Sequence, residues 1–441
     1  MVPTELYHQS PRCRLVAVPL PDKEDRARYL EHRLGPHDQR ELMATLSDGL
    51  FLHDLDGIAD SVRPLRQPSA TQIRQAVNRY RLGEQEDYWG KLDIAQLADA
   101  NRWFTEVEGV KGQERAVEKV CSVLYRARAG LAGMASGTAT KPKGILFFAG
   151  PPGVGKTLLA KKLAKFLFGT EEAFIRIDMS ELKDEHSMSK LIGAPPSYVG
   201  YERGGLLTNA VMERPFSVVL FDEIEKAHPK IMDVFLQLLD EGRLTDSKGQ
   251  TVFFGETVVI FTSNIGNRAR DRLRKDDHGR EYDWLQAILD DSSLSDDQRV
   301  AQVQQHFRQC VGAFFESEIS RPELLRRIGD NIVAFNHIRS ESVQREILTS
   351  HLERIRREFE DRFRHLGHTL EVDTEPVVAL LLKKHGHDTM PRFGGGGITN
   401  AIEDELIDVL APEVLAIEDV RRTSVAFHVL ARGDDLVVQT T

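Results

Sequence analysis

The stretch ILFFAGPPGVGKTLLAKKLAKFLFG, residues 145–169, decides the fold of the central part of this chain. Residues 145–149 are all apolar, which predicts a strand buried on both faces, and the residues after the glycines have helical spacing. In this strand-turn-helix setting the turn predicts a loop that binds phosphates through its main-chain N–H groups. The turn has the form G-x-x-x-x-G-K-[ST] and consists of Gly150, Pro151, Pro152, Gly153, Val154, Gly155, Lys156 and Thr157.

Two side chains complete this predicted phosphate loop. We expect Lys156 to hold the β and γ phosphates of a nucleotide and the Thr157 hydroxyl to ligate Mg²⁺. A glycine-rich turn that matches the pattern by chance is the alternative, and the flanking strand and helix argue against it. The sequence therefore predicts ATP and Mg²⁺ as cofactors.

Short apolar runs alternate with helical patterns through residues 103–335. Runs that are apolar at nearly every position suit strands buried on both faces, and their alternation with helices is typical of a parallel sheet. The sequence therefore predicts an α/β fold with a parallel five-stranded sheet. Besides 145–149, the runs are FIRID (174–178), SVVLF (217–221), TVVIFTSN (257–264) and NIVAF (331–335).

Polar side chains follow two of these runs. Asp222 and Glu223 come at the carboxyl end of SVVLF, the edge at which parallel sheets bind their ligands. We expect Asp222 to position Mg²⁺ through water and Glu223 to act as the general base for an attacking water. Asn264 ends another run, where its amide would hold that water and sense the γ phosphate. A solvated strand end and an asparagine that caps a turn are the respective alternatives.

Composition narrows the class of partners. The chain has 58 Lys and Arg against 68 Asp and Glu, a formal charge of −10, which argues against broad binding to nucleic acid or anionic lipid. Cys13, Cys121 and Cys310 are scattered, so no disulfide framework is predicted. We find no signal peptide and no long apolar run, and we expect a cytoplasmic protein with neither a membrane span nor a nucleic-acid partner.

The flanking regions differ from the central part. Residues 1–100 have helical patterns and no phosphate motif, so we expect a helical N-terminal region. Residues 101–338 form the expected ATPase core, in which the charged stretch 267–315 predicts a solvated surface insertion with some helix. Residues 339–441 predict a small α-rich lid with a β edge, formed by the strand HTLEV (368–372) and the hairpin SVAFHVLARGDDLVVQ (424–439).

From about residue 107 onward the chain resembles the second ATPase module of Clp-type AAA+ unfoldases. The combination of blocks is specific to that clade rather than to P-loop proteins in general. The matching blocks are VKGQERAVEKV (110–120), GPPGVGKT (150–157), FGTEEAFIRIDMSEL (168–182), KLIGAPPSYVGYERGG (190–205), SVVLFDEIEKAHP (217–229), LLDEGRLTDSKGQTV (238–252), IFTSN (260–264) and RPELLRRI (321–328).

This resemblance implies a P-loop AAA+ core with an α-helical lid, ATP hydrolysis, and assembly of identical subunits into a ring, expected to be a hexamer. It places Val110, Gly112 and Gln113 near the adenine. It also makes Arg327 a finger that reaches the nucleotide of a neighbouring subunit, with Arg326 standing where the family has Asn. An exposed charged helix face is the alternative for the two arginines.

A second implication concerns the substrate. Tyr198, Val199 and Gly200 match the pore loop, whose tyrosine grips an unfolded polypeptide in the channel of the ring; a tyrosine in a surface turn is the alternative. The resemblance thus implies a ring motor that unfolds, disaggregates or remodels proteins by threading them through a central pore. A nucleotide-dependent switch or assembly factor without processive translocation is the alternative function.

Two departures from the family qualify this resemblance. Where the family has Gly-Ala-Arg-Pro before a lid helix, this chain has MPRFGGGGITNAI (390–402), so that Gly396 stands in the place of the arginine and Arg392 is the substitute that we expect. The Ile/Leu-Gly-Phe/Leu tripeptide of the peptidase-docking loop is missing between Asn264 and Arg321, so we expect no direct docking of a peptidase. Residues 1–100 resemble, more weakly, the lid of a preceding AAA+ module, with an independent helical adaptor as the alternative.

Overall fold

A computed structural model describes residues 20–35, 39–65, 68–83, 87–132, 140–195, 198, 201–275, 280–386, 389–418 and 424–441. The chain divides into two compact units, and each is described by itself. The first comprises residues 1–87 with 133–141, and the second comprises residues 88–132 with 142–441.

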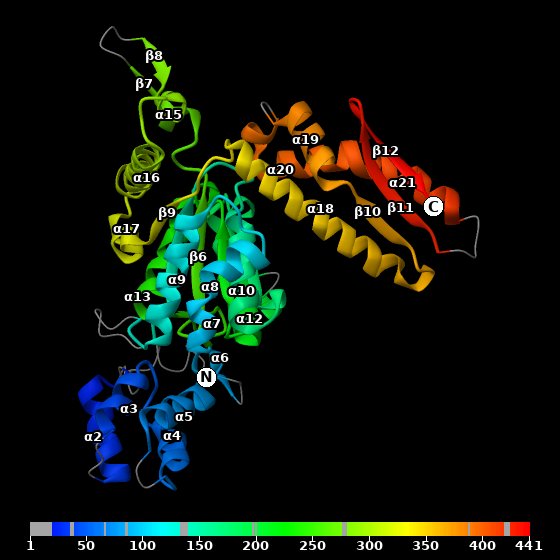
Figure 1. Ribbon diagram of the computed structural model, residues 1–441. Helices are drawn as coiled ribbons and strands as arrows, with labels where there is room; N and C mark the ends of the chain where they lie inside the picture. The colour runs from blue at the N-terminus through cyan, green and yellow to red at the C-terminus, as the bar shows by residue number, and fades with distance from the viewer. Residues whose placement is uncertain are drawn as a thin grey trace. The chain divides into compact units, whose positions relative to one another are not determined.

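The first unit is helical, as predicted (Figure 1). Asp22 and Ser69 each begin a helix with a reciprocal capping box, which satisfies main-chain donors at the first turn. Its core is apolar, with Leu30, Met43 and Leu55 at most 1% exposed. The described helices of this unit are α2 (Lys23–Leu34), α3 (Arg40–Leu46), α4 (Asp54–Val62) and α5 (Ala70–Leu82).

The second unit is built on a parallel sheet of five strands in the order β2-β3-β6-β1-β9, which confirms the predicted fold class. Since connections between parallel strands must cross over the sheet, helices separate the strands along the chain. Each predicted apolar run became a strand. The strands are β1 (Gly144–Ala149), β2 (Phe174–Asp178), β3 (Val218–Asp222), β6 (Val258–Ser263) and β9 (Ile332–Ala334).

Alternate strand residues fix one face of this sheet. Phe147, Phe221 and Phe261 belong to one hydrophobic cluster with the helices that cover that face, and each is at most 2% exposed. The rings of Phe221 and Phe261 stack with centroids 5.3 Å apart. A fully buried phenylalanine contributes roughly 1.5–3 kcal/mol, so these rings hold the strands in the register that sets the site.

Helices and short hairpins surround this sheet (Figure 1). The hairpins pair β4 (Arg243–Thr245) with β5 (Thr251–Phe253), and β7 (Leu273–Lys275) with β8 (Glu281–Asp283). The helices are α6 (Tyr88–Lys91), α7 (Ile94–Ala98), α8 (Ala100–Arg102), α9 (Glu114–Arg128), α10 (Lys156–Phe168), α11 (Met188–Ile192), α12 (Leu206–Glu213), α13 (Met232–Glu241), α14 (Ala269–Arg272), α15 (Trp284–Asp290), α16 (Asp296–Ala313) and α17 (Pro322–Ile328).

The segment 267–315 corrects one expectation, because only part of it is a solvated insertion. Residues 273–275 of β7 are exposed, as predicted. The long helix α16, however, buries Val303, Phe307 and Val311 in the hydrophobic cluster of the sheet. These residues recur every fourth position, the spacing of a helical core stripe, which the surrounding charged residues masked in the overall composition.

The C-terminal part contains α18 (Glu341–Phe363), β10 (Thr369–Val372), α19 (Thr374–His385), α20 (Thr389–Ile402), α21 (Asp408–Glu418), β11 (Ala426–Arg432) and β12 (Asp435–Thr440). Its sheet has the order β10-β11-β12, and β11 and β12 form the predicted terminal hairpin. Helix α20 contains a break at Gly394, where the main chain leaves helical geometry. None of the described helices has the length and apolarity needed to cross a membrane.

Candidate active site

The phosphate loop lies between β1 and α10, the setting that the sequence predicted. Gly155 immediately precedes the helix with φ of +96°, a left-handed conformation that side chains rarely adopt, and a Cβ there would meet nothing within 4 Å. Glycine is therefore needed at this position for its backbone and not for close packing. The helix then begins at Lys156, so its first N–H groups face the loop.

Lys156 is buried at the base of this loop. Its Nζ donates to the carbonyl oxygens of Gly150 (2.6 Å) and Pro151 (2.8 Å) and to Oδ1 of Asn264 (3.0 Å). Burial lowers the pKa of Lys156 to about 8, against the opposite effect of Glu225 and other nearby carboxylates. An anion bound at the loop would favour the charged ammonium, because an opposite charge counters the cost of desolvation.

Asn264 joins the two halves of the site. Its Oδ1 accepts from Lys156, and its Nδ2 donates to Oε1 of Glu223 at 2.9 Å. Its main-chain N–H donates to Oε1 of Glu225, also at 2.9 Å. The amide therefore links the lysine of the phosphate loop to the carboxylate that the sequence predicted as general base.

Asp222 ends β3 and is 7% exposed. The guanidinium of Arg176 donates to Oδ2 of Asp222 through Nε at 2.9 Å, with a second nitrogen at 2.7 Å. The Thr262 hydroxyl donates to Oδ1 of the same carboxylate. Both carboxylate oxygens thus have partners, and a charge-assisted fork of this kind fixes the orientation of the carboxylate.

Glu223 has an unusual main-chain conformation. Its φ of 57° and ψ of 55° lie in the left-handed region, which costs a residue with a Cβ about 1–2 kcal/mol. Its N–H donates to Oγ1 of Thr262 at 3.1 Å, which helps to hold this turn. The conformation directs the side chains of Asp222 and Glu223 to different partners, Arg176 and Asn264 respectively.

Three residues of this network were not predicted from the sequence. Arg176 lies on β2, Thr262 lies on β6, and Glu225 follows the predicted acidic pair. Oε2 of Glu225 is buried without a hydrogen-bond partner in the described residues. A signal existed for two of them, since Arg176 and Thr262 are polar positions within apolar strands that flank the strand ending in Asp222.

The residues expected near the adenine lie where the core continues into α18. Val110 and Gln113 are each 2% exposed. The Gln113 side chain donates to the carbonyl of Asn336 at 3.0 Å and accepts from its N–H at 2.8 Å. Gly112 has φ of +70°, and a Cβ there would lie 2.6 Å from Cγ1 of Val343 on α18. The segment is therefore tightly held between the sheet and the C-terminal helices.

The remaining predicted residues lie outside this hydrogen-bonded group. Arg327 on α17 is paired with Asp240 of α13 and has a side chain 42% exposed. Tyr198 is 70% exposed, whereas Val199 and Gly200 lie outside the described residues. Arg392 falls within α20, and its side chain is also outside what the structure describes.

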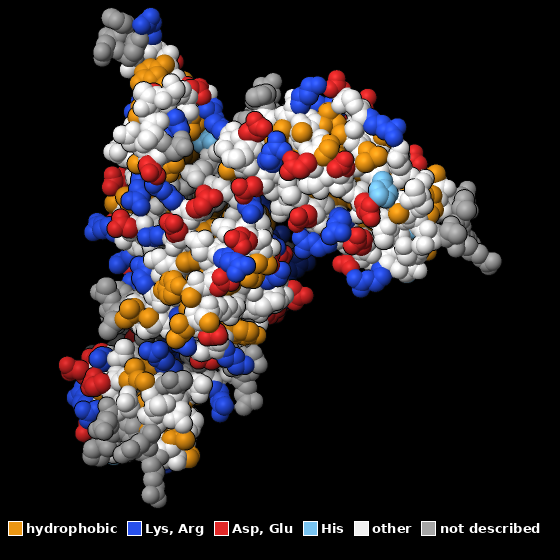
Figure 2. Space-filling view, viewed as in Figure 1, with side chains coloured by type: hydrophobic (Ala, Val, Ile, Leu, Met, Phe, Trp, Pro, Cys, Tyr) orange, Lys and Arg blue, Asp and Glu red, His pale blue; other side chains and the backbone are white. Residues whose placement is uncertain are grey.

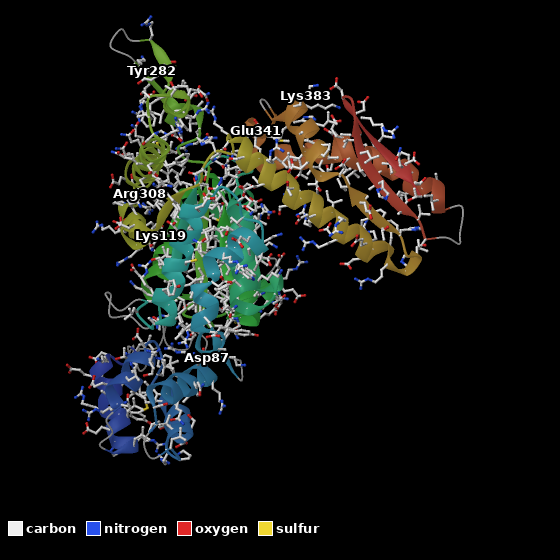
Figure 3. All side chains as sticks on the ribbon, in the orientation of Figure 1. Asp87, Lys119, Tyr282, Arg308, Glu341 and Lys383 are labelled. Atoms are coloured by element: carbon white, nitrogen blue, oxygen red, sulfur yellow. The ribbon has the colours of Figure 1, made fainter. Side chains whose placement is uncertain are left out.

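A separate hollow opens on the surface of the core. Lys119 on α9 and Arg308 on α16, both labelled in Figure 3, line it together with Val333 of β9. Among its lining residues are none of the predicted site residues. We therefore assign the phosphate site from the loop geometry and not from the shape of the surface.

A buried histidine close to the site gives the protein an expected pH dependence. Burial, aided by Arg339, lowers the pKa of His337 to about 4, and its Nδ1 has no partner among the described residues. Below about pH 6.5 the unfolded chain binds a proton at this residue that the folded chain refuses, so the free energy of unfolding should fall by about 1.4 kcal/mol per pH unit down to about pH 4.

Thermal unfolding between pH 7 and pH 5 measures this contribution. We expect His337→Phe to flatten the dependence relative to the unchanged protein, whereas the same change at the exposed His365 should leave the slope as it is. An equal slope in the unchanged protein and in His337→Phe would contradict the assignment. His351 on α18, whose pKa burial also lowers to about 4, supplies the slope that remains.

The side chains present fit a magnesium-bound triphosphate. Lys156 and the main chain of the loop supply donors and positive charge for phosphate oxygens. Hydroxyl and carboxylate oxygens are the ligands that Mg²⁺ prefers, and Thr157 at the start of α10 and Asp222 at the end of β3 carry them.

Comparisons with known proteins agree with this geometry. A family model described as AAA domain (Cdc48 subfamily) matches residues 141–366. Chaperone protein ClpB 1 of Thermosynechococcus vestitus is 42% identical over 360 residues, which cover 80% of this chain and 37% of that protein. Chaperone protein ClpB of Pseudomonas putida is 36% identical over 401 residues, covering 90% of this chain and 42% of the relative. The chain thus spans well under half the length of these two relatives.

A solved structure is also similar. It is a cryo-EM reconstruction of Hsp104 in a closed state with ATPγS and FITC casein. The match has a TM-score of 0.67 and 26% sequence identity, and it covers 97% of this chain and 70% of the Hsp104 chain.

Proposed function

The chain belongs to the AAA domain (Cdc48 subfamily) family and is a Clp-type AAA+ ATPase, and from this premise we propose that it binds ATP with Mg²⁺ at residues 150–157 and hydrolyses it to do work on protein substrates. The observation that carries the proposal is the Asn264 side chain, which hydrogen-bonds both Lys156 and Glu223. It unites a phosphate-binding cation and a candidate base in one group.

Each residue of this group has a proposed task. Lys156 and the N–H groups of residues 153–157 bind phosphate oxygens, while Thr157 and Asp222 hold Mg²⁺. Glu223 accepts the proton of the attacking water, and Asn264 keeps that carboxylate in place through Nδ2. Bound Mg²⁺ neutralises charge that develops on the phosphates. The proposed adenine contacts are Val110, Gly112 and Gln113, and their tight packing supports this role.

We propose that the substrate is an unfolded polypeptide drawn through the pore of a ring. The 70% exposure of Tyr198 supports this, because an aromatic face gives contact that tolerates many sequences. Val199 and Gly200 are included by their place in the motif. The names of the similar chaperones, and the casein bound in the Hsp104 reconstruction, support a protein substrate.

A homo-oligomer, proposed to be a hexamer, would complete the site. Arg327 is partly exposed and lies outside the hydrogen-bonded group of its own chain, which supports a role toward the nucleotide of a neighbouring subunit. Arg392 remains our candidate for a charged contact from the C-terminal helices. It precedes by two residues the point at which α20 reaches the phosphate loop.

Further parts of the proposal concern partners and organisation. Basic and acidic side chains are interspersed on the face shown in Figure 2, which supports the absence of a nucleic-acid partner. We propose a cytoplasmic protein without direct peptidase docking. We also propose three functional parts, residues 1–100 as the lid of a preceding module, 101–338 as the ATPase core and 339–441 as the C-terminal lid.

Replacing Tyr198 with alanine tests the threading proposal. Loss of an aromatic contact worth about 1 kcal/mol should lower the number of substrate molecules unfolded per ATP hydrolysed by about fivefold. The measurement uses a folded fluorescent protein with a disordered tag and records fluorescence loss together with phosphate release. Tyr198→Phe keeps the aromatic face and is expected to retain most of the coupling.

Other outcomes separate the motor from its rival. ATP turnover with no unfolding of the tagged substrate, unchanged by Tyr198→Ala, would contradict threading. If Glu223→Gln instead held a stable partner complex in the presence of ATP, the switch or assembly factor would replace the motor as the preferred function.

A further inference from the structure

Helix α20 reaches the phosphate loop through a run of glycines. The run comprises Gly394, Gly395, Gly396 and Gly397. Its N–H at Gly395 donates to the carbonyl oxygen of Gly153 at 2.5 Å. A main-chain donor of the C-terminal helices is therefore bound directly to the loop that forms the proposed phosphate site.

The requirement for glycine is confined to part of the run. Gly394 has φ of 58° and ψ of −138°, a conformation accessible almost only to glycine. A Cβ there would lie 2.7 Å from the carbonyl oxygen and 2.8 Å from the carbonyl carbon of Gly153. At Gly395 a Cβ would lie 2.9 Å from the same oxygen. At Gly396 it would meet nothing within 4 Å.

This difference within the run argues against a merely flexible linker. A linker would require no particular glycine, whereas here the first two glycines permit contact between two main chains and the third does not. The atoms that a Cβ would strike at Gly394 are backbone atoms, which cannot move aside as a side-chain tip can. The break in α20 at Gly394 is what brings the following N–H to Gly153.

The bonded carbonyl belongs to a peptide group that has a second function in the loop. The carbonyl of Gly153 and the N–H of Val154 share one planar trans peptide, so they point in opposite directions. Holding the carbonyl toward α20 therefore fixes the direction of the Val154 N–H, one of the donors proposed to bind phosphate. Val154 is itself 4% exposed, which limits other movement of this peptide.

We propose that Gly394 and Gly395 are positioning residues, which orient the Gly153–Val154 peptide for phosphate binding and thereby couple the C-terminal helices to the nucleotide. The coupling runs through main-chain atoms and needs no charged side chain. This inference rests on the proposed ATP-binding function and adds to it the element that sets the loop.

The test compares Gly394→Ala with the matched control Gly396→Ala in the full chain. The dissociation constant for a fluorescent ATP analogue is measured for each, and amide hydrogen exchange over residues 390–402 is measured without nucleotide. We expect Gly394→Ala to bind about tenfold more weakly, a loss equal to one hydrogen bond to a charged site, and to exchange faster. We expect Gly396→Ala to stay within about twofold of the unchanged protein, because alanine suits a helix.

A third variant protects the test from misfolding. Gly395→Ala has the close contact without the left-handed backbone, so it should weaken binding even if Gly394→Ala fails to fold, which thermal unfolding would reveal. Unchanged affinity and exchange in the folded variants, or equal losses in Gly396→Ala, would overturn this inference alone. Absence of saturable binding in the unchanged protein would overturn the proposed function and this inference with it.

Discussion

Replacing Lys156 with methionine is expected to weaken ATP binding by on the order of 100-fold, because each charge-assisted hydrogen bond contributes about 1.5–3 kcal/mol. Methionine keeps the length of the side chain and removes its charge and its donors. Titration with a fluorescent ATP analogue measures the loss. Turnover should fall at least as far, since bound nucleotide would also lack its main cation.

A control is needed because Lys156 also has partners within the protein. Its ammonium serves the carbonyls of Gly150 and Pro151 and the Asn264 amide, so removing it leaves buried acceptors unpaired. Thermal unfolding separates a loss of stability from a loss of binding. Lys161→Met, at an exposed position of the same helix, should bind as the unchanged protein does. A Lys156→Met variant with normal affinity would remove the basis for the assigned site.

Replacing Glu223 with glutamine should lower ATP turnover by about 10²–10⁴-fold, the usual contribution of a general base. Binding should persist, because the Oε1 of glutamine can still accept from Nδ2 of Asn264 and the phosphate loop is unchanged. The measurements are single-turnover hydrolysis and the affinity for ATP. Because this variant would keep ATP bound, its sedimentation with and without ATP also reports the size of the assembly.

Glu225→Gln is the matched control for this second prediction. The two carboxylates are near neighbours, and both accept from Asn264, Glu225 from its main-chain N–H and Glu223 from its side chain. Glutamine at position 225 retains the acceptor, so we expect turnover to fall by less than about tenfold. A larger loss at Glu225 than at Glu223 would show that the general base had been assigned to the wrong carboxylate.

Much of the fold could be predicted because its signals are local. The apolar runs of β1, β3 and β6 and the glycine-rich turn before Lys156 lie within single short stretches, and buried parallel strands tolerate few polar residues. The hairpin of β11 and β12 was equally legible from alternation and a glycine turn. The long helix α16 was not, because charged residues on its solvent face outweighed an apolar stripe in the average.

The site was predictable in its groups and not in its connections. The sequence indicated Lys156, Glu223 and Asn264 separately, but only the structure shows that one amide bonds the other two. Arg176 and Thr262 reach Asp222 from neighbouring strands, and such pairing depends on strand order. The contact of Gly395 with Gly153 depends on how α20 folds back, which no short stretch encodes.

The pairing of β3 with β6 has a consequence for how faithfully the chemistry is inherited on each folding event. Phe221 lies opposite Phe261, one residue before Asp222 and Thr262 respectively. A slip by one residue would turn the aromatic ring out of the apolar layer and put a carboxylate into it, a penalty far larger than any hydrogen bond of the site could repay. Two phenyl rings, chemically inert themselves, thus act as the proofreaders that keep the acidic pair in its place.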